Sequence, residues 1–415
     1  MSRSPEALLR RAEEHCFFLS PDDSGAALCR ANVRFGIAKI QAAQERFGAP
    51  PDATFLGAPD ATVTRNKGRW AQGFGYGGRI DYTGDFAVLD VKPNACGMLV
   101  AALDERPDAA AVQERLDALR TAPLEVDGVP LQYDLANGNH FLDLFETADE
   151  DAGGAAGAGA GGEAKVRGRI GRWVAILHGS GREMRRASAR GLGMYWDESA
   201  ELRSAAEVLE TAFGTLHLLR GDAARAWWEF MEWVDGFHAR RRAAQADFLF
   251  GAGRWRRIAD ATHQGLRGPT TALLGALVFD GDPDELHPLT LRPDEPAYLL
   301  KGRSNVRADV LERLGMAERA ARLGVLERLG RANLLPHGGG YTYPRFAAQV
   351  DTLGLRDGVR RFRLTPLASG AAVETIEAPA DLAPTFRGRE VLDRVLDLEL
   401  GEVAATLTPL YVARP

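Results

Sequence analysis

Apolar positions at the start of the chain recur with the spacing of helices. The pattern covers residues 6–15 and 25–48, and the Pro50-Pro51 pair then ends it, because proline lacks an amide hydrogen and clashes with a preceding helical turn. We therefore predict an N-terminal helical segment over residues 1–49. From 55 to 91 the pattern changes to β-branched and aromatic residues broken by glycines, which is typical of strands joined by turns.

Further along, continuous apolar runs alternate with helix-like segments. The runs, which predict buried strands, are CGMLVAAL (96–103), GRWVAILHGSG (171–181), PTTALLGALVFDG (269–281) and EPAYLLKG (295–302). Helical patterns cover 108–122, 198–256 and 307–331, and the chain closes with a helix and then a strand over 388–415. Because helices and strands mix without a regular β-α-β alternation, we predict an α+β fold, with one large domain over residues 50–415.

One segment departs from both patterns. Residues 150–165, EDAGGAAGAGAGGEAK, are of low complexity. Because the run after it predicts a core strand like those before it, we expect a flexible surface loop inside the domain rather than a linker between two domains.

Composition places the chain in the globular range, with 45% hydrophobic and 26% charged residues among 415. The net charge of −6 gives no overall field that attracts nucleic acid or an anionic membrane. The arginine-rich strings at 167–173, 181–190 and 238–245 are candidates for a local basic groove, although a solvated helix or loop face is the favoured interpretation of each alone.

The cysteine count and the absence of apolar spans indicate a compartment. Three cysteines argue against a disulfide scaffold and for a reducing environment. The N-terminus carries no secretory pattern, and no stretch reaches the roughly 18 apolar residues of a membrane span. We therefore expect a cytoplasmic protein without a membrane partner.

Four of the eight histidines stand at the ends of apolar runs, beside glycine or an amide: His140, His178, His263 and His337. A neighbouring glycine lets a ligand approach the backbone. Imidazoles, with the Cys96 thiolate added, suit Mn, Fe, Co or Zn. Their spacing is too long for a local motif, so two interpretations stay open: packed histidines, or a metal site assembled by the fold. The other four, His15, His217, His238 and His287, lack this context and are expected to be structural.

Taken in order, five strings of the chain form a pattern. They are Cys96-Gly-Met, Gly138-Asn-His-Phe-Leu-Asp143, His178-Gly-Ser-Gly-Arg182, His263-Gln264 and His337-Gly-Gly-Gly340. This order resembles that of the RNA-splicing ligase RtcB family, from about Gly73 to the C-terminus. The resemblance implies an RtcB-like single large domain with mixed β-sheets, flanking helices and a central metal cleft.

The resemblance also implies a chemistry. Members of that family use GTP and two Mn²⁺ ions to join an RNA 3′-phosphate, or a 2′,3′-cyclic phosphate, to a 5′-hydroxyl end through a guanylylated histidine. By position His337 would be that nucleophile. The implied metal ligands are Cys96, His140, His178 and His263, and the implied nucleotide contacts are Asn139, Asp143, Gly338, Gly339 and Arg414. An archease-like activator and a monomeric state are further expectations.

The chain departs from the family pattern mainly on the nucleotide side. Pro93 stands where the family has a metal-binding aspartate, so Asp90 is the substitute that we expect to reach the metal. Asp143 replaces a glutamate, and Tyr341 replaces an arginine. Two alternatives therefore stay open: a metal-dependent phosphoesterase or other phosphoryl-transfer enzyme on the same scaffold, and a non-catalytic RNA-binding relative.

Overall fold

Seven antiparallel strands form the largest sheet of the protein in the computed structural model, which describes residues 4–135, 138–148, 170–188, 190–280, 282, 284–356 and 359–413. The strands lie in the order β12 (Trp255–Gln264), β5 (Cys96–Leu103), β9 (Trp173–Gly179), β8 (Phe141–Thr147), β23 (Gly401–Ala413), β16 (Ala297–Gly302) and β15 (His287–Leu289). β5 and β9 are apolar on both faces because helices cover one face and further core covers the other.

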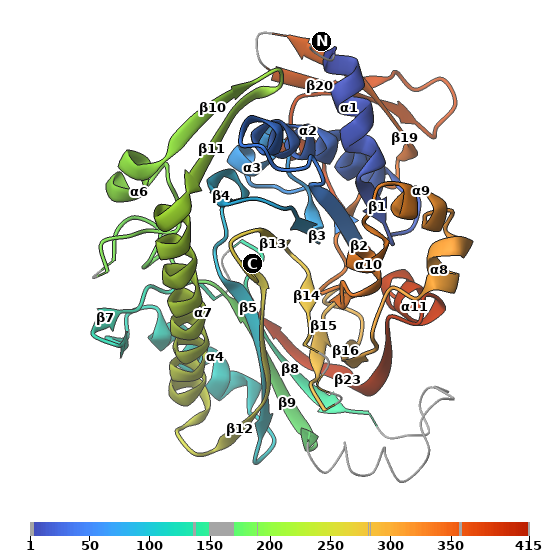
Figure 1. Cartoon of the computed structure of the whole chain (residues 1–415). Helices are drawn as coiled ribbons and strands as arrows, with labels where there is room; N and C mark the ends of the chain where they lie inside the picture. Colours follow the sequence, from blue (N-terminus) through green and yellow to red (C-terminus); the bar gives the residue numbers. More distant parts are fainter. Residues whose placement is uncertain are drawn as a thin grey trace.

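Side-chain alternation divides the core around this sheet. Leu99 and Ala101 of β5 pack with α4 (Ala109–Leu119) and α7 (Gly221–Phe250) on one face, whereas Met98 and Val100 pack with β16 and β23 on the other. Figure 1 shows α7 as a long helix beside the sheet. Cys96 has the parity of Met98 and Val100, so its side chain lies on the face away from α7.

A second, four-stranded sheet lies closer to the N-terminus. Its order is β1 (Cys16–Phe18), β2 (Thr54–Thr62), β3 (Tyr76–Asp81) and β13 (Thr271–Leu274), and only the β1–β2 pair is parallel. Helix α2 (Ser24–Arg46) packs against it, and α1 (Pro5–Glu14) packs against α2. β13 follows β12 in the chain and joins the other sheet, so the two sheets share a connection beside Gln264.

Smaller elements complete the fold (Figure 1). The strands are β4 (Phe86–Val88), β6 (Glu125–Val126), β7 (Val129–Pro130), β10 (Glu207–Thr211), β11 (Gly214–Arg220), β14 (Leu277–Val278), β17 (Leu334–Leu335), β18 (Tyr341–Thr342), β19 (Phe346–Arg356), β20 (Val359–Pro366), β21 (Glu374–Ile376) and β22 (Thr385–Phe386). The helices are α3 (Lys67–Gln72), α6 (Ala200–Ala205), α8 (Ala308–Arg313), α9 (Ala317–Arg322), α10 (Leu326–Gly330) and α11 (Glu390–Asp397), with 3-10 turns η1 (Leu89–Val91) and η3 (Pro379–Asp381). None of the helices in the described ranges is long and apolar enough to cross a membrane.

The prediction of mixed helices and sheets is confirmed, with corrections to individual elements. The helix predicted over 198–256 is confirmed at α6 and α7 but is wrong between them, where β10 and β11 form a hairpin that turns at Gly214, a residue with φ of +97°. The helix predicted over 307–331 is divided into α8, α9 and α10 by Gly315 and Gly324, which both adopt positive φ. The predicted loop at 150–165 lies entirely outside the described residues, and the RtcB-like arrangement stays a prediction.

Candidate metal centre

Strand pairing brings Cys96 and two histidines together at one end of the seven-stranded sheet. Met98 of β5 lies opposite His178 of β9, so Cys96, two residues earlier, is the diagonal neighbour of His178 on the same face. On the other side of β5 the register of β12 shifts between Thr262 and Gln264. His263 is the residue at this irregularity, and such a bulge re-aims a side chain out of the regular alternation.

The three side chains form a compact, buried group. The Cys96 sulfur lies 3.1 Å from His178 Nε2, which in turn lies 3.3 Å from His263 Nε2. The ligand atoms of all three residues lie within 4.8 Å of one another. Two nitrogens bound to one ion at about 2.1 Å in tetrahedral geometry are about 3.4 Å apart. The spacing observed here therefore fits donors that share one ion.

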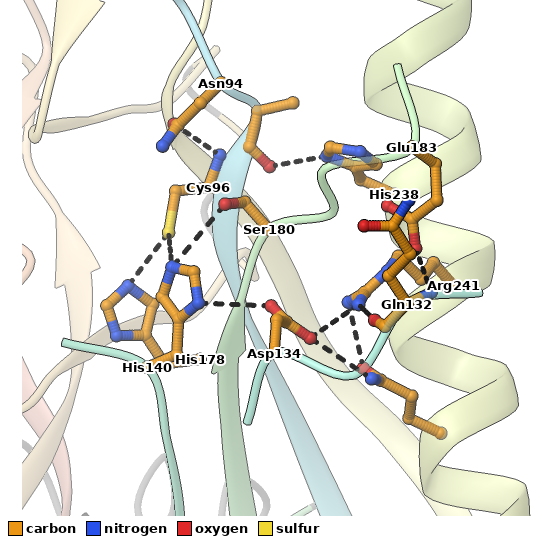
Figure 2. Close-up of polar contacts among 12 residues, drawn as sticks. Asn94, Cys96, Gln132, Asp134, His140, His178, Ser180, Glu183, His238 and Arg241 are labelled. Atoms are coloured by element: carbon orange, nitrogen blue, oxygen red, sulfur yellow. Dashed lines mark hydrogen bonds and ion pairs between the residues drawn. The ribbon is translucent and has the colours of Figure 1, made fainter. Parts of the chain in front are cut away.

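His140 approaches the same sulfur from a different strand. It directly precedes β8, next to β9, and its Nε2 lies 3.4 Å from the Cys96 sulfur and 3.5 Å from the Ser180 hydroxyl oxygen (Figure 2). On the other side of the ring, Nδ1 lies 3.1 Å from a carboxylate oxygen of Asp134. Cys96 thus stands between His140 on one side and the His178–His263 pair on the other, as a thiolate that bridges two cations would.

The electrostatics of the group favour a thiolate among imidazoles. Burial by itself raises the pKa of the Cys96 thiol, but the neighbouring imidazoles, first that of His178, outweigh it and hold that pKa well below its usual value. Burial lowers the pKa of His263 to about 3, so this ring is neutral and has a free lone pair. Thiolate and neutral imidazole are the forms that bind metal ions.

His140 differs from the other two rings in its charge. Burial by itself lowers the pKa of His140, but the Cys96 thiolate and the Asp134 carboxylate raise it to about 10. A proton held between a thiolate and an imidazole marks a position where positive charge is favoured, and a metal ion bound there would replace that proton. The described residues Cys96, His178 and His263 can therefore hold a metal ion, and His140 is placed to complete or extend the set.

His337 lies against this group although it comes from another part of the chain. Its ring stacks on that of His263, with centroids 4.3 Å apart, and lies 6.4 Å from that of His178. Its Nδ1 is 2.9 Å from a carboxylate oxygen of Asp60, a fully buried residue of β2. The same Asp60 oxygen accepts the backbone N–H groups of His337 and Gly338, at 3.2 and 3.3 Å. Asp60 therefore fixes both the ring and the loop.

A pocket of about 170 Å³ opens beside the histidines. It is lined by Thr62, Tyr76, Gly138, Asn139, Phe141, His178, Thr290, Leu291, Pro293, His337, Gly338, Gly339, Gly340, Tyr341 and Phe386. The rings of Tyr341 and Phe386 lie 4.9 Å apart at its wall. These described lining residues offer flat aromatic surface but no lysine or arginine, which suits a planar ligand more than a highly charged one.

The predicted nucleotide contacts have separate outcomes. Asn139, Gly338 and Gly339 line the pocket, but the Gly338 N–H donates to Asp60, so it is already engaged. Asp143 is fully buried within β8, opposite Val412 of β23. The glycine at 339 is required by packing, since a Cβ there would lie 2.2 Å from the Arg387 carbonyl oxygen. The nucleotide roles of these residues stay predictions, and Arg414 lies outside the described residues.

The substitute carboxylate expected at Asp90 has other partners. One oxygen of Asp90 accepts the Trp196 indole N–H at 3.0 Å, and the other accepts the His217 backbone N–H at 2.8 Å. The His217 ring also faces this carboxylate at 3.1 Å and stacks on Trp196. These contacts fix η1 against β11, so the expectation that Asp90 joins the metal ligands is not supported by its position.

Two aspartates of the site were not predicted from the sequence. Asp60 stands in the otherwise apolar β2, and Asp134 stands six residues before His140. A buried carboxylate within an apolar strand was a signal for Asp60, because charged side chains are rarely buried without a partner. Nothing in the local sequence marks Asp134, whose partners are His140, which directly precedes β8, and two residues of α7.

The chain matches no protein-family model, and no curated protein is significantly similar to it in sequence.

Proposed function

We propose that the chain is a metal-dependent nucleotidyl- and phosphoryl-transfer enzyme with His337 as its nucleophile, acting as a GTP-dependent RNA ligase on 3′-phosphate and 5′-hydroxyl ends. One observation carries the proposal: a carboxylate oxygen of Asp60 lies 2.9 Å from His337 Nδ1, while the His337 ring stacks on a ring of the candidate metal-binding group. The ordered Cys and His strings that resemble the RtcB family add the substrate class.

The residues of the chain divide the work. Asp60 at Nδ1 favours the tautomer that carries its proton there, which leaves the Nε2 lone pair as the nucleophile. A metal ion held by Cys96, His178 and His263 would neutralise phosphate charge next to that nitrogen. Tyr341 and Phe386 give the base of a nucleotide an aromatic surface in the pocket.

The proposed sequence has three transfers. His337 Nε2 attacks the α-phosphorus of GTP, so an N–P bond forms and the bond to the leaving pyrophosphate breaks. An oxygen of the RNA 3′-phosphate then takes the guanylate and frees the histidine. Finally the 5′-hydroxyl attacks the activated 3′-phosphate, GMP leaves and the hydroxyl proton passes to solvent.

Radiolabelled GTP tests the first transfer directly. We expect purified protein with Mn²⁺ and α-labelled GTP to carry acid-labile label, and His337→Ala to carry none. His287→Asn is the matched control, since His287 is also buried but belongs to β15. Absence of label on wild-type protein, together with no joining of 3′-phosphate to 5′-hydroxyl RNA, would reject the ligase proposal.

A second candidate, a metal-dependent phosphoesterase, is favoured by the character of the pocket. Its described lining residues include no lysine or arginine to bind a triphosphate. This candidate predicts phosphate release from RNA ends or phosphodiesters with Mn²⁺ or Zn²⁺ and without GTP. If the protein shows neither labelling by GTP nor hydrolysis, the remaining alternative is a non-catalytic RNA-binding relative. Equal RNA binding by wild-type and His337→Ala protein would support that alternative.

A further inference from the structure

A buried chain of charged groups continues from His140 away from the candidate metal centre. Figure 2 shows it running from the imidazole through Asp134 to Arg241 and Glu183. These residues come from three separated segments, and Arg241 belongs to α7, on the far face of the seven-stranded sheet. A charged network of this kind is expensive to bury, so its position directly behind a candidate ligand requires an explanation.

Contacts with residues other than His140 hold the Asp134 carboxylate in place. Its Oδ1 accepts from Arg241 Nη2 at 2.5 Å and from the Gln245 amide at 3.3 Å. Its Oδ2 is left to face His140 Nδ1 at 3.1 Å. One oxygen therefore anchors the carboxylate to α7, and the other is aimed at the imidazole.

Arg241 is itself held on every side. Its side chain is completely buried, its Nε donates to Glu183 at 3.0 Å, and its Nη2 also donates to the Gln132 carbonyl oxygen at 2.5 Å. The guanidinium thus has two carboxylate partners. Removal of Asp134 leaves Glu183 in place to neutralise it, so an Asp134 variant does not strand an unpaired buried cation.

The glycines of the His178-Gly-Ser-Gly string make room for these carboxylates. A Cβ on Gly179 would lie 2.7 Å from Asp134 Oδ2, and a Cβ on Gly181 would lie 1.7 Å from Glu183 Oε2. Side chains at these two positions would therefore displace the network. Glycine at these two positions of the His178 string therefore leaves space for the carboxylates of Asp134 and Glu183.

From this geometry we propose that Asp134, anchored by Arg241, is a positioning residue that keeps the proton of His140 on Nδ1 and turns Nε2 toward Cys96 as a metal ligand. The inference rests on the metal centre of the proposed function. Carboxylates behind ligating histidines fix the ring and the tautomer, and their loss commonly weakens metal affinity by about 10- to 100-fold.

Cobalt binding measures this role without any assay of activity. Co²⁺ titration of the purified protein, followed by the thiolate-to-cobalt absorption and the visible d–d bands, reports affinity and ligand geometry together. We expect Asp134→Ala to lower Co²⁺ affinity by about 10- to 100-fold and to alter the d–d bands. His140→Ala should do the same, and the double variant should be no worse than His140→Ala alone, because Asp134 acts through His140.

Two control variants separate positioning from general destabilisation. Asp260→Asn disrupts the equally buried pair with Arg242, the next residue of α7, which does not contact a ligand of the cluster. Asp127→Asn disrupts the exposed pair with Arg240 on the same helix. We expect both to keep the wild-type cobalt spectrum, with thermal unfolding confirming that each variant is folded.

The outcomes are distinguishable. If wild-type protein binds no Co²⁺, the metal centre itself is wrong. If wild type binds and folded Asp134→Ala binds equally with the same spectrum, the positioning inference alone is overturned. Additive losses in the double variant would also overturn it, since they would mean that Asp134 acts independently of His140. If Asp134→Ala does not fold, the same cobalt titrations with Asp134→Asn, alone and combined with His140→Ala, test the inference instead.

Discussion

The ring of His337 stacks on the ring of His263, with centroids 4.3 Å apart and planes 24° apart. One ring follows β17 and the other stands at the bulge of β12, so the contact joins two distant segments. Because this contact joins a candidate nucleophile to a candidate ligand, we expect a substitution of either residue to change the position of the other ring.

Loss of the sulfur should remove the metal centre. We expect Cys96→Ala to abolish the thiolate-to-cobalt absorption and to lower bound Mn²⁺ or Zn²⁺ below half of the wild-type stoichiometry, measured by elemental analysis. Cys29→Ala is the control, because Cys29 is a fully buried thiol on the core-facing side of α2. Retention of the cobalt absorption in folded Cys96→Ala would contradict Cys96 as a metal ligand.

Loss of the clamp on His337 should slow its reaction without weakening the metal centre. Asp60→Asn keeps the shape of the side chain but no longer favours the Nδ1 proton, so we expect labelling by GTP to slow by on the order of 10²- to 10⁴-fold. Cobalt affinity should stay within about threefold of wild type, since Asp60 contacts His337 rather than the ligand group.

The control for that experiment is Asp81→Asn, which changes a carboxylate of β3 paired with Arg79 in the same sheet. It should label at the wild-type rate. Equal slowing by both variants would mean that the sheet, rather than the Asp60–His337 contact, is responsible.

Metal removal should destabilise the wild-type protein selectively. An ion that binds only the folded state stabilises it by about 2.7 kcal/mol at a free concentration of 100 Kd. We therefore expect Mn²⁺ or Zn²⁺ to raise the Tm by several degrees and a chelator to reverse the shift. In Cys96→Ala the shift should disappear, and an undiminished shift would indicate that the ion binds elsewhere.

A buried lysine should make stability depend on pH in the alkaline range. Burial lowers the pKa of Lys39 from 10.5 to about 7; the ammonium contacts the Gln72 side chain and the Thr215 carbonyl. Between pH 7 and 10.5 the unfolded chain binds this proton and the folded protein does not, so this residue makes stability rise with pH in that window.

Urea unfolding at several pH values tests this assignment. Lys39→Met should be more stable than wild type at pH 7, with the difference shrinking as the pH rises toward 10. Lys67→Met changes an exposed lysine and should leave the pH profile unchanged. A Lys39→Met profile parallel to that of wild type would show that Lys39 titrates normally.

The sequence predicted the elements that carry the site better than the site itself. The run CGMLVAAL predicted the strand β5, and GRWVAILHGSG predicted β9, because a strand buried on both faces is apolar throughout. The hairpin β10–β11 was missed because tertiary pairing with β4 favours an extended conformation in a segment of helical pattern.

Pattern also selected most of the candidate ligands. Cys96, His140, His178 and His263 stood out because each borders an apolar run, and the structure places Cys96 in contact range of both His140 and His178. The position of Asp90 does not support its predicted role, because distance along the chain from Cys96 says nothing about the direction of its side chain, which turns to His217.

The sequence by itself determined which strands are buried and which residue types stand at their ends, because periodicity and burial are local properties. Only the tertiary structure decided that the start of β5 meets the ends of β9 and β12 and that a register shift turns His263 toward Cys96. It alone paired Asp60 with His337, 277 residues away. Such contacts depend on the register between strands and on the packing of distant segments, and neither is encoded in any local stretch of sequence.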